Sequence, residues 1–217
     1  MEELTKSNAA KPRKRDPEAK KQVLIQATLD TVAEIGITDT SVSRIIERAG
    51  LSRGMIQLHF GGKDNLLTAA AQQFSVQYYA NLDRLTGLNP DASAEETIMA
   101  VVRADLSETL LNPRNTKIWH AFRGVASSHP GIARYSSTQD EKLVTTLYRA
   151  FEELAQADMP HDQDVSKLAA DATDGTLALL EGMWVNYLTD MDGFSRENAV
   201  ALVQRFLSGL FPGKFRS

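Results

Sequence analysis

The sequence has no cysteine among its 217 residues, which excludes disulfide bonds and thiolate metal sites. It also has no apolar run close to the roughly 20 residues that a membrane-spanning helix needs. The first residues are polar and charged, unlike the apolar segment of a secretory signal. These absences predict a soluble, cytoplasmic protein without a membrane segment. The length of the chain is sufficient to bury a sizeable core.

Motifs of the common enzyme classes are missing as well. There is no His-Glu-x-x-His, no Gly-x-Ser-x-Gly, no phosphate-binding glycine loop and no dinucleotide fingerprint. The four histidines, His59, His120, His129 and His161, lie on different predicted elements and lack the spacing of metal ligands. We therefore expect no catalytic residue, no metal and no cofactor.

Acidic residues outnumber basic ones by 28 to 24, but the excess is confined to one part of the chain. Residues 1–65 carry 11 basic and 9 acidic side chains, whereas residues 66–217 carry 13 and 19. This asymmetry has the sign of a nucleic-acid-binding head on an acidic body. Residues 1–15, with a basic run at 11–15, are expected to form a disordered arm, which either enters a DNA minor groove or is a solvated tail.

Alternating runs of β-branched residues are absent too, and segments beyond residue 15 show the periodicity of amphipathic helices. Glycine and proline interrupt this periodicity at intervals and mark helix ends. The sequence therefore predicts an all-α fold with a three-helix helix-turn-helix head over residues 16–65 and a larger helical domain over residues 66–217. Helices of the larger domain are expected near 91–111, 114–127, 137–157, 162–189 and 195–210.

The head is predicted from local signals. An aspartate cap and a proline in the first turn open its first helix, and a glycine ends it. Apolar residues at helical spacing bury one face of the second helix, and a tight turn at Gly50 separates it from the third. The predicted spans are Asp16–Gly36, Thr40 or Ser41–Ala49, and Ser52–Phe60 capped by Ser52, followed by a long helix from Lys63.

The third helix is predicted to present a face suited to a DNA major groove. Its outward residues are expected to be Arg53, Gly54, Gln57, Leu58 and His59. Gly54 lets the backbone come close to DNA, Gln57 can bond an adenine edge, and Leu58 can contact a thymine methyl group. The alternative is a helical hairpin that never meets DNA.

This segment resembles the head of the TetR family of transcriptional regulators. The matching residues are Gly36, Thr40, Ala49-Gly50-Leu51-Ser52, His59-Phe60 and Lys63-Asp64-Asn65-Leu66. The resemblance implies that Thr40 or Ser41, Ser43 and Lys63 hold phosphates, whereas Gln57 stands where many members have a phosphate-binding tyrosine. The complete predicted set of DNA contacts is Thr40, Ser41, Ser43, Ser52, Arg53, Gly54, Gln57, Leu58, His59 and Lys63.

The larger domain resembles the BetI-like, choline-responsive repressors within that family. The similarity lies in Thr116-Lys-Ile-Trp-His-Ala-Phe122, His129-Pro130, Leu180-Glu-Gly-Met-Trp184 and Asn198-Ala199, with Glu181 in place of the family's aspartate. The resemblance implies a repressor that a small molecule, choline or a related quaternary ammonium, releases from its operator. The alternatives are an apolar or anionic effector, or a small-molecule-binding or interaction module with a vestigial head.

A quaternary ammonium has no hydrogen to donate, so proteins bind it with aromatic faces and a nearby carboxylate. The predicted ligand-binding residues are Glu108, Trp119, Phe122, Asp174, Trp184 and Tyr187, with Glu181 as a further candidate counter-charge. The alternative is that the tryptophans are ordinary core residues and that the acids lie on solvated faces.

Two apolar stripes in the last two predicted helices favour a homodimer, in which paired hairpins form a four-helix bundle. The predicted interface residues are Leu177, Leu180, Leu188, Leu202, Val203, Phe206 and Leu210. Such a dimer would place two third helices about one DNA turn (~34 Å) apart on a near-palindromic operator in double-stranded DNA. An intramolecular core is the alternative for both stripes.

Overall fold

The computed structural model describes residues 17–87, 91–135, 141–158 and 164–215, and every regular element within these ranges is a helix. This confirms the all-α prediction, while the predicted arm over residues 1–15 lies outside the described residues. None of the helices described has the length and apolar character needed to cross a membrane. The helices are α1 (Pro17–Asp39), α2 (Val42–Ala49), α3 (Gly54–Phe60), α4 (Lys63–Thr86), α5 (Ala94–Asp105), α6 (Pro113–Ala126), α7 (Pro130–Ala133), α8 (Glu141–Asp158), α9 (Val165–Thr189) and α10 (Arg196–Leu210).

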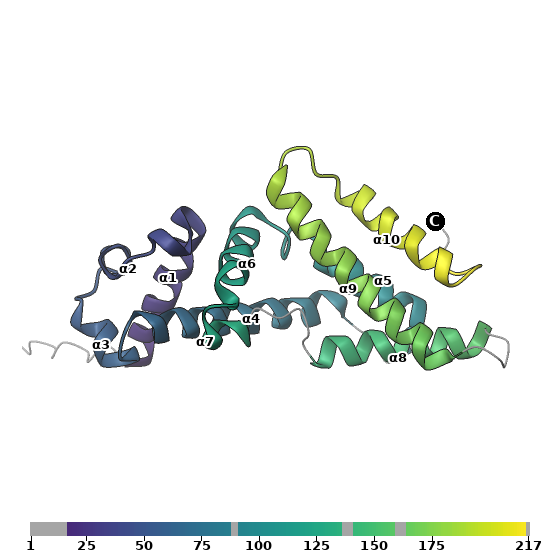
Figure 1. Cartoon of the computed structure of the whole chain (residues 1–217), viewed down its shortest axis with the longest axis horizontal. Helices are drawn as coiled ribbons and strands as arrows, with labels where there is room; N and C mark the ends of the chain where they lie inside the picture. The colour runs from purple at the N-terminus through teal and green to yellow at the C-terminus, as the bar shows by residue number, and fades with distance from the viewer. Residues whose placement is uncertain (1–16, 88–90, 136–140, 159–163, 216–217) are drawn as a thin grey trace, which may run out of the picture.

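The helices form a small head, α1 to α3, at one end of the molecule and a larger body, α5 to α10, that extends away from it (Figure 1). The long helix α4 runs from the head along the body, so the predicted boundary at residue 65 falls inside its first turn. Helix α6 stands between the two parts and contacts both α1 and α9. Head and body are therefore joined by a continuous helix and by a second helix packed against both.

The helices and turns of the head lie where the local signals predict them, with one correction, while the predicted cap Asp16 lies outside the described residues. Gly36 has a positive φ of 78° and interrupts the helical backbone of α1, and Gly50 turns the chain between α2 and α3 with a φ of 62°. Ser52, however, does not cap α3: the helix begins at Gly54, and neither Ser52 nor Arg53 makes a side-chain capping bond. The carbonyl of Ser52 instead accepts a hydrogen bond from the backbone N–H of Met55 at 3.0 Å.

Helix α5 is shorter than the predicted span of 91–111. Ser93 opens it three residues late, with a capping box in which Ser93 and Glu96 bond each other's backbone N–H groups. It ends at Asp105 because the Ser107 hydroxyl bonds the Ala104 carbonyl and competes with helical bonding. The chain then turns, and Asn112 caps α6. Glu108 therefore lies beyond the end of α5 and is exposed.

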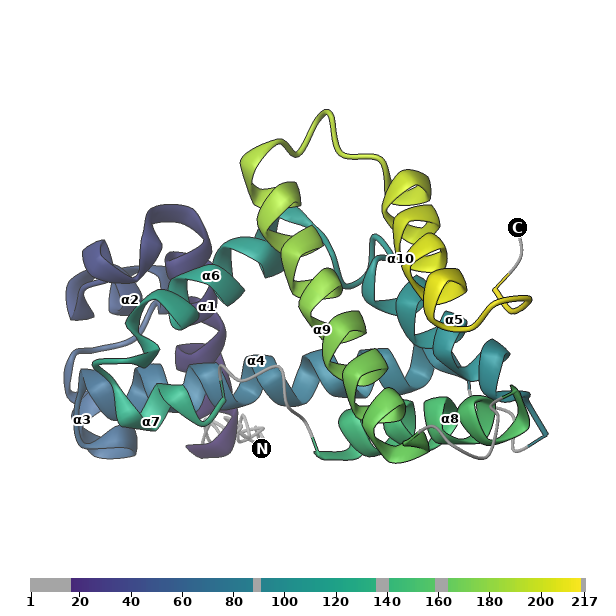
Figure 2. The same ribbon diagram turned by 45° about the vertical axis from the view of Figure 1, so that its right-hand side comes forward.

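The body is built around α8 and α9, which lie against each other, with α5 packed on α8 and α10 beside α5 (Figure 2). Phe151 of α8 stacks on Phe211 at 5.8 Å between ring centroids, and Phe215 meets Phe211 edge-on. All three rings are buried, so the end of the chain closes this side of the core. The backbone N–H of Phe215 donates to Glu95 at the start of α5, at 2.7 Å.

The short helix α7 touches α4 at a position where only glycine fits. A Cβ atom added at Gly131 would lie 2.5 Å from the Thr68 hydroxyl and 3.2 Å from its methyl group. Gly124, on the exposed side of the neighbouring helix α6, has no atom within 4 Å of the equivalent position. The close approach of α7 and α4 next to the head therefore depends on Gly131.

We expect Gly131→Ala to lower the free energy of unfolding by about 1–3 kcal/mol because the methyl group overpacks the α7–α4 contact. The matched control Gly124→Ala should raise it by roughly 0.5–1 kcal/mol, since alanine is the better helix former. Urea unfolding followed by circular dichroism measures both, and Thr68→Ala should rescue Gly131→Ala. Equal effects of the two glycine substitutions would contradict the packing described.

Candidate functional site

The first candidate site is the surface of the head formed by α3 and the beginnings of α2 and α4. Most of the predicted DNA contacts are exposed there. Exposed side chains or backbone are found at Ser41, Ser43, Ser52, Arg53, Gly54, Gln57 and Leu58, whereas Lys63 is half-buried. Leu58 is 73% exposed, so its side chain is accessible to a partner on this face.

Thr40 is a correction to the predicted set. Its side chain is 0% exposed, and its hydroxyl donates to the carbonyl of Gly36 at 2.7 Å, so it is not available to a phosphate. Ser41 is the N-cap of α2 and lies at the surface, where its Oγ accepts from the backbone N–H of Arg44 at 3.3 Å. The periodicity of the sequence could not separate these two neighbours, because either can precede a helix.

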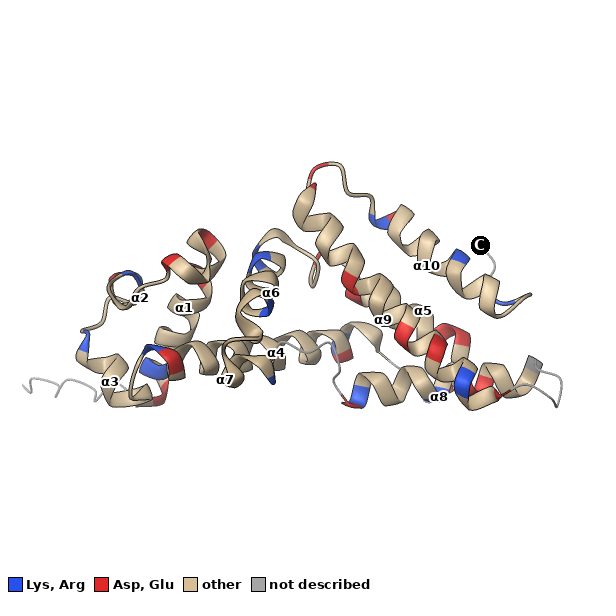
Figure 3. Ribbon diagram, in the orientation of Figure 1, with Lys and Arg blue, Asp and Glu red and all other residues tan. Residues whose placement is uncertain are grey.

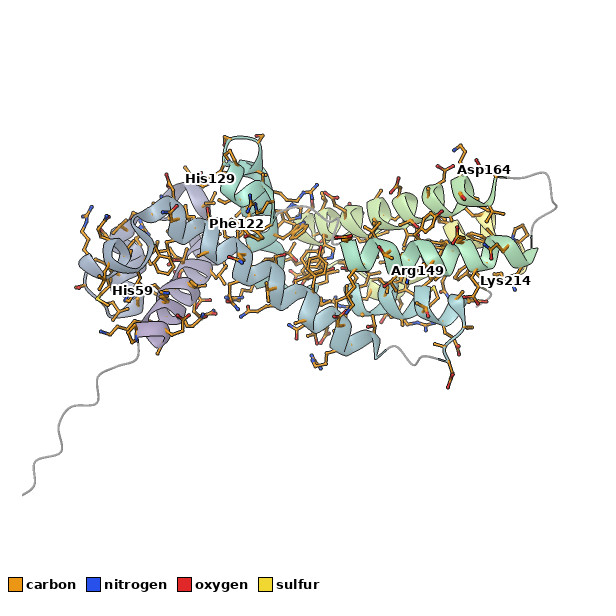
Figure 4. The ribbon with its side chains drawn as sticks, turned by 90° about the horizontal axis from the view of Figure 1, so that it is seen from below. His59, Phe122, His129, Arg149, Asp164 and Lys214 are labelled. Atoms are coloured by element: carbon orange, nitrogen blue, oxygen red, sulfur yellow. The ribbon has the colours of Figure 1, made fainter. Side chains whose placement is uncertain are left out.

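His59 is a second correction, because it is half-buried rather than turned outward. Its Nε2 atom is buried and has no hydrogen-bond partner among the described residues, and its ring packs edge-on near Phe60. Figure 4 shows it at the head end of the molecule. The outward face of α3 thus consists of Gln57, Leu58 and the backbone at Gly54.

Two acidic side chains of α1 form ion pairs with arginines away from α3. On α1, Glu34 pairs with Arg48, and Asp30 accepts from Nε and Nη2 of Arg114 at 3.0 and 2.7 Å. Several basic residues have no ion-pair partner in the part of the chain that the structure describes. Among them are Arg44, Arg53 and Lys63, on α2, before α3 and at the start of α4. Figure 3 shows blue, basic segments on α2, beside α3 and at the start of α4, where an acidic segment lies next to them. These cations are available to a polyanion on the surface around α3.

The second candidate site lies inside the body, where three aromatic rings from α4, α6 and α9 meet. The ring centroids of Tyr78, Trp119 and Trp184 are 5.8 to 6.2 Å apart. They enclose a cavity of about 30 Å³, which we call the aromatic chamber. Its lining consists of Tyr78, Tyr79, Leu82, Val101, Asp105, Trp119, Leu143, Leu177, Leu180, Glu181 and Trp184.

A buried carboxylate, Asp105, lies in the chamber wall and is 4% exposed. One of its oxygens accepts from the Tyr78 hydroxyl, and the other accepts from Nε1 of Trp184 at 3.1 Å. No described lysine, arginine or histidine pairs with it. Burial raises the pKa of Asp105 to about 6, although the bonds from Tyr78 and Trp184 favour the ionised form. The Tyr78 pKa is raised well above its ordinary value, first by burial and then by the negative charge of Asp105.

Asp105 and Tyr78 were not predicted as ligand-binding residues, although the sequence held a signal for the first. Asp105 follows Val101 by four residues and Val102 by three, which puts it on the apolar face of α5. A lone acid on an apolar face is costly to bury and is therefore a candidate for a functional role. No comparable signal marks Tyr78, whose neighbour in the sequence is also a tyrosine.

The structure brings only some of the predicted ligand residues to the chamber. Trp119, Trp184 and Glu181 line it. Glu108 and Asp174 are exposed and do not: Glu108 follows the early end of α5, and Asp174 lies on the solvent face of α9. The prediction that these two residues supply counter-charges inside the chamber is therefore wrong.

Two predicted aromatic residues are also placed elsewhere. Phe122 is buried on α6 but is not among the lining residues. Tyr187 packs edge-on against Phe194, with the Arg196 guanidinium 5.3 Å from its ring centroid. Tyr187 therefore belongs to the packing between the end of α9 and the start of α10.

Some of the residues predicted for the dimer interface are buried within the single subunit, and others are exposed. Leu180 and Val203 are buried within the single subunit, at 5% and 0% exposure, and Leu177 lines the chamber. These three predictions are therefore corrected, because Leu177 and Leu180 of α9 and Val203 of α10 face the interior of the subunit. Leu188, Phe206 and Leu210 are half-buried, and Leu202 is 40% exposed. Val185 of α9, which is not in the predicted set, is 46% exposed.

Comparisons with known proteins cover both the head and the body of the chain. Residues 24–70 match the model of the bacterial regulatory proteins of the tetR family. Residues 94–212, more than half of the chain, match the model of the C-terminal domain of BetI-type transcriptional repressors. The chain belongs to the TetR family. Its body is of the BetI repressor type, and regulators of this family bind DNA and small-molecule effectors, typically as dimers.

Individual relatives support the same assignment. The HTH-type transcriptional regulator BetI of Escherichia coli (strain K12) is 29% identical over 194 residues, which cover 89% of this chain and 94% of that protein. A crystal structure of a regulator from Pseudomonas aeruginosa PAO1 is 28% identical, with a TM-score of 0.78 over 94% of this chain and 95% of that one. A regulator from Saccharomonospora viridis, solved in complex with choline, shares the fold at 19% identity, with a TM-score of 0.72 over 89% and 97%.

The buried carboxylate of this TetR-family body should lower its stability at neutral pH. Because the folded-state pKa of Asp105 is about 6 rather than 3.8, folding favours the protonated form. Protonated Asp105 contributes to the free energy of unfolding, and this contribution is fully present below about pH 4. It is lost as the pH rises through 6, and the total loss is about 3 kcal/mol. Asp105→Asn keeps a group that can accept from Trp184 and is neutral at every pH.

We therefore expect Asp105→Asn to raise the free energy of unfolding above that of the wild-type protein. This increase should be larger at pH 7.5 than at pH 4.5 by about 1–3 kcal/mol. Urea unfolding of both proteins at the two pH values gives this difference. A stability difference that does not vary with pH would show that Asp105 has an ordinary pKa.

Proposed function

We propose that this TetR-family regulator is a homodimeric repressor that leaves its operator when a small organic cation binds in the aromatic chamber. The observation that supports this most directly is the buried carboxylate of Asp105 beside the rings of Tyr78, Trp119 and Trp184. Aromatic faces attract a cation through the ring quadrupole, and a carboxylate supplies the counter-charge. A quaternary ammonium such as choline has this chemistry.

The same feature argues against the other effector classes. An anion placed in the chamber would meet the negative charge of Asp105 without a compensating cation in the interior. A purely apolar effector would leave that carboxylate buried with only two hydrogen bonds. The choline in the related Saccharomonospora viridis structure agrees with a cationic effector.

The size of the chamber suggests how binding reaches the head. A cavity of about 30 Å³ holds roughly one water molecule, so a trimethylammonium group has to push the rings apart. Tyr78 lies on α4, which continues into the head, and Trp119 lies on α6, whose Arg114 pairs with Asp30 of α1. Opening the chamber therefore displaces both helices that hold the head, and biases an equilibrium between two head positions.

In the proposed DNA complex, α3 enters the major groove and presents Arg53, Gln57 and Leu58 to base edges. Ser41, Ser43 and Lys63 contact phosphates on either side of the groove. Arg44, Arg53 and Lys63, which have no acidic partner within the described ranges, support this over a vestigial head. A protein bound to the chromosome acts in the cytoplasm, and the proposal assigns it no catalytic step.

Dimerisation completes the proposal, because one head reads only one half of a near-palindromic operator. Exposed apolar side chains on the outer faces of α9 and α10, Val185 and Leu202, favour these helices as the interface. Leu188, Phe206 and Leu210, each half-buried in the single subunit, are proposed to become buried on pairing. The heads would then lie about one DNA turn (~34 Å) apart.

Binding of the head to DNA is tested with two variants that should behave differently. Lys63→Ala removes a phosphate contact, so we expect weaker binding to every sequence and a salt dependence flatter by about one unit of slope. Gln57→Ala removes a base contact and should relax the preference at one base position. Fluorescence anisotropy with DNA from upstream of the gene measures both. Lys167→Ala, which changes an exposed residue of α9, is the control. An unchanged affinity of both head variants for DNA would refute the assignment of this surface as the DNA-binding site.

Effector binding is tested by titrating choline and tetramethylammonium against tryptophan fluorescence, since both tryptophans of the chain line the chamber. Asp105→Asn should lose at least about tenfold in affinity because the counter-charge is gone. In the unchanged protein the dissociation constant should rise about tenfold per pH unit below 6, as Asp105 becomes protonated. Saturating choline should release the DNA.

Glu108→Gln and Asp174→Asn are matched controls, because both remove an exposed carboxylate that is not in the chamber wall. They should leave the affinity for choline unchanged. Choline binding that is insensitive to Asp105 and sensitive to either control would move the effector site away from the aromatic chamber.

A further inference from the structure

The rim of the aromatic chamber holds a cation supplied by the protein itself. Arg123 lies four residues after Trp119 on α6, so its side chain reaches back over the tryptophan. The guanidinium carbon is 5.7 Å from the centroid of the Trp119 ring, within the range of roughly 6 Å over which a cation and an aromatic face attract. The same guanidinium pairs with Glu181 of α9, a residue of the chamber wall.

The ion pair and Asp105 differ in burial. The side chains of Arg123 and Glu181 are 34% and 28% exposed, which places them at the mouth of the chamber. Asp105, at 4% exposure, lies in its interior. Two of the features that would attract a ligand cation at the mouth, the Trp119 face and the Glu181 carboxylate, are thus already engaged by Arg123.

The charges of the chamber therefore leave one negative charge uncompensated. Its lining contains two carboxylates, Asp105 and Glu181, among otherwise apolar and aromatic side chains. Arg123 balances Glu181, so only Asp105 attracts a ligand. A ligand with one positive charge satisfies this site, whereas the second charge of a dication would meet the guanidinium of Arg123.

We propose that Arg123 competes with the effector from within the protein. Its guanidinium occupies the mouth of the chamber until a ligand cation displaces it. It also restricts the effector to a single positive charge. This rests on the proposed function, in that the chamber binds a cation. Arg123 shares α6 with Arg114, the residue that pairs with Asp30 of the head. Displacing Arg123 therefore loosens the helix through which the body contacts the head.

The test compares the unchanged protein with Arg123→Met, which keeps an apolar side chain over Trp119 but removes the charge. The probes are tetramethylammonium and hexamethonium, which carry one and two quaternary ammonium groups, measured by tryptophan fluorescence. We expect Arg123→Met to bind tetramethylammonium about three- to thirtyfold more tightly, because both Glu181 and the ring become available. The gain for hexamethonium should be larger still.

Glu181→Gln should have the opposite effect. It leaves the charge of Arg123 unbalanced at the mouth, so tetramethylammonium should bind more weakly than to the unchanged protein. Arg123→Lys keeps a cation beside Glu181 and should bind like the unchanged protein. Arg149→Met removes an exposed arginine from α8, away from the chamber (Figure 4), and should change nothing. Thermal unfolding of each variant confirms that it is folded.

The outcomes separate this inference from the proposed function. If the unchanged protein binds tetramethylammonium and loses it in Asp105→Asn, but Arg123→Met binds no more tightly, the competitor is refuted and the cation site stands. If Arg123→Met gains equally for both probes, the restriction to one charge is refuted. If no protein binds either probe, the proposed function fails and this inference fails with it.

Discussion

The burial of one carboxylate is the constraint on which the arrangement of the body depends. Asp105 comes from α5, and its two oxygens accept from Tyr78 of α4 and Trp184 of α9, so a single side chain fixes the relative positions of three helices. An ionised carboxylate away from water is unfavourable unless hydrogen bonds or a cation compensate it. The two bonds compensate only in part, since the pKa remains raised to about 6. The ionised carboxylate therefore remains electrostatically unfavourable in the folded protein, and a cationic ligand would stabilise it.

The contacts between body and head are of a different kind, and this difference suits a regulator. The Arg114–Asp30 pair between α6 and α1 is more than one-third exposed on the arginine side, and pairs of this type contribute about 0–1 kcal/mol. The Gly131 contact between α7 and α4 is tight, but it involves a single turn of helix. Helix α6 also packs along α1, so the head can follow a movement of α6 while these two smaller contacts adjust. Adjusting them requires only part of the few kcal/mol that a ligand supplies.

How much of this could be predicted from the sequence follows from the range of each interaction. The head was predicted in detail because its signals, such as Ser41 before α2 and the left-handed Gly50, act within a few residues. The aromatic walls Trp119 and Trp184 were expected from the resemblance to BetI-like repressors, whereas helical spacing added Phe122 and Tyr187, which do not line the chamber. The counter-charge was misplaced to Glu108 because the end of α5 depends on side-chain bonds to the backbone around Ser107 and Asn112. The leucines of α9 were assigned outward because periodicity shows that a stripe is buried, without showing what buries it.

A chamber smaller than its ligand makes binding and conformational change the same event in the proposed mechanism. The effector gains the ring faces and Asp105, but it has to separate Tyr78 from Trp119 and displace Arg123 from Glu181. Each of these costs lowers the apparent affinity, since only the opened state binds. The effector concentration at which the repressor responds is then set by residues that hold the chamber closed as much as by those that hold the ligand. Relatives with the same aromatic walls but another residue at position 123 would accordingly respond to the same cation at different concentrations.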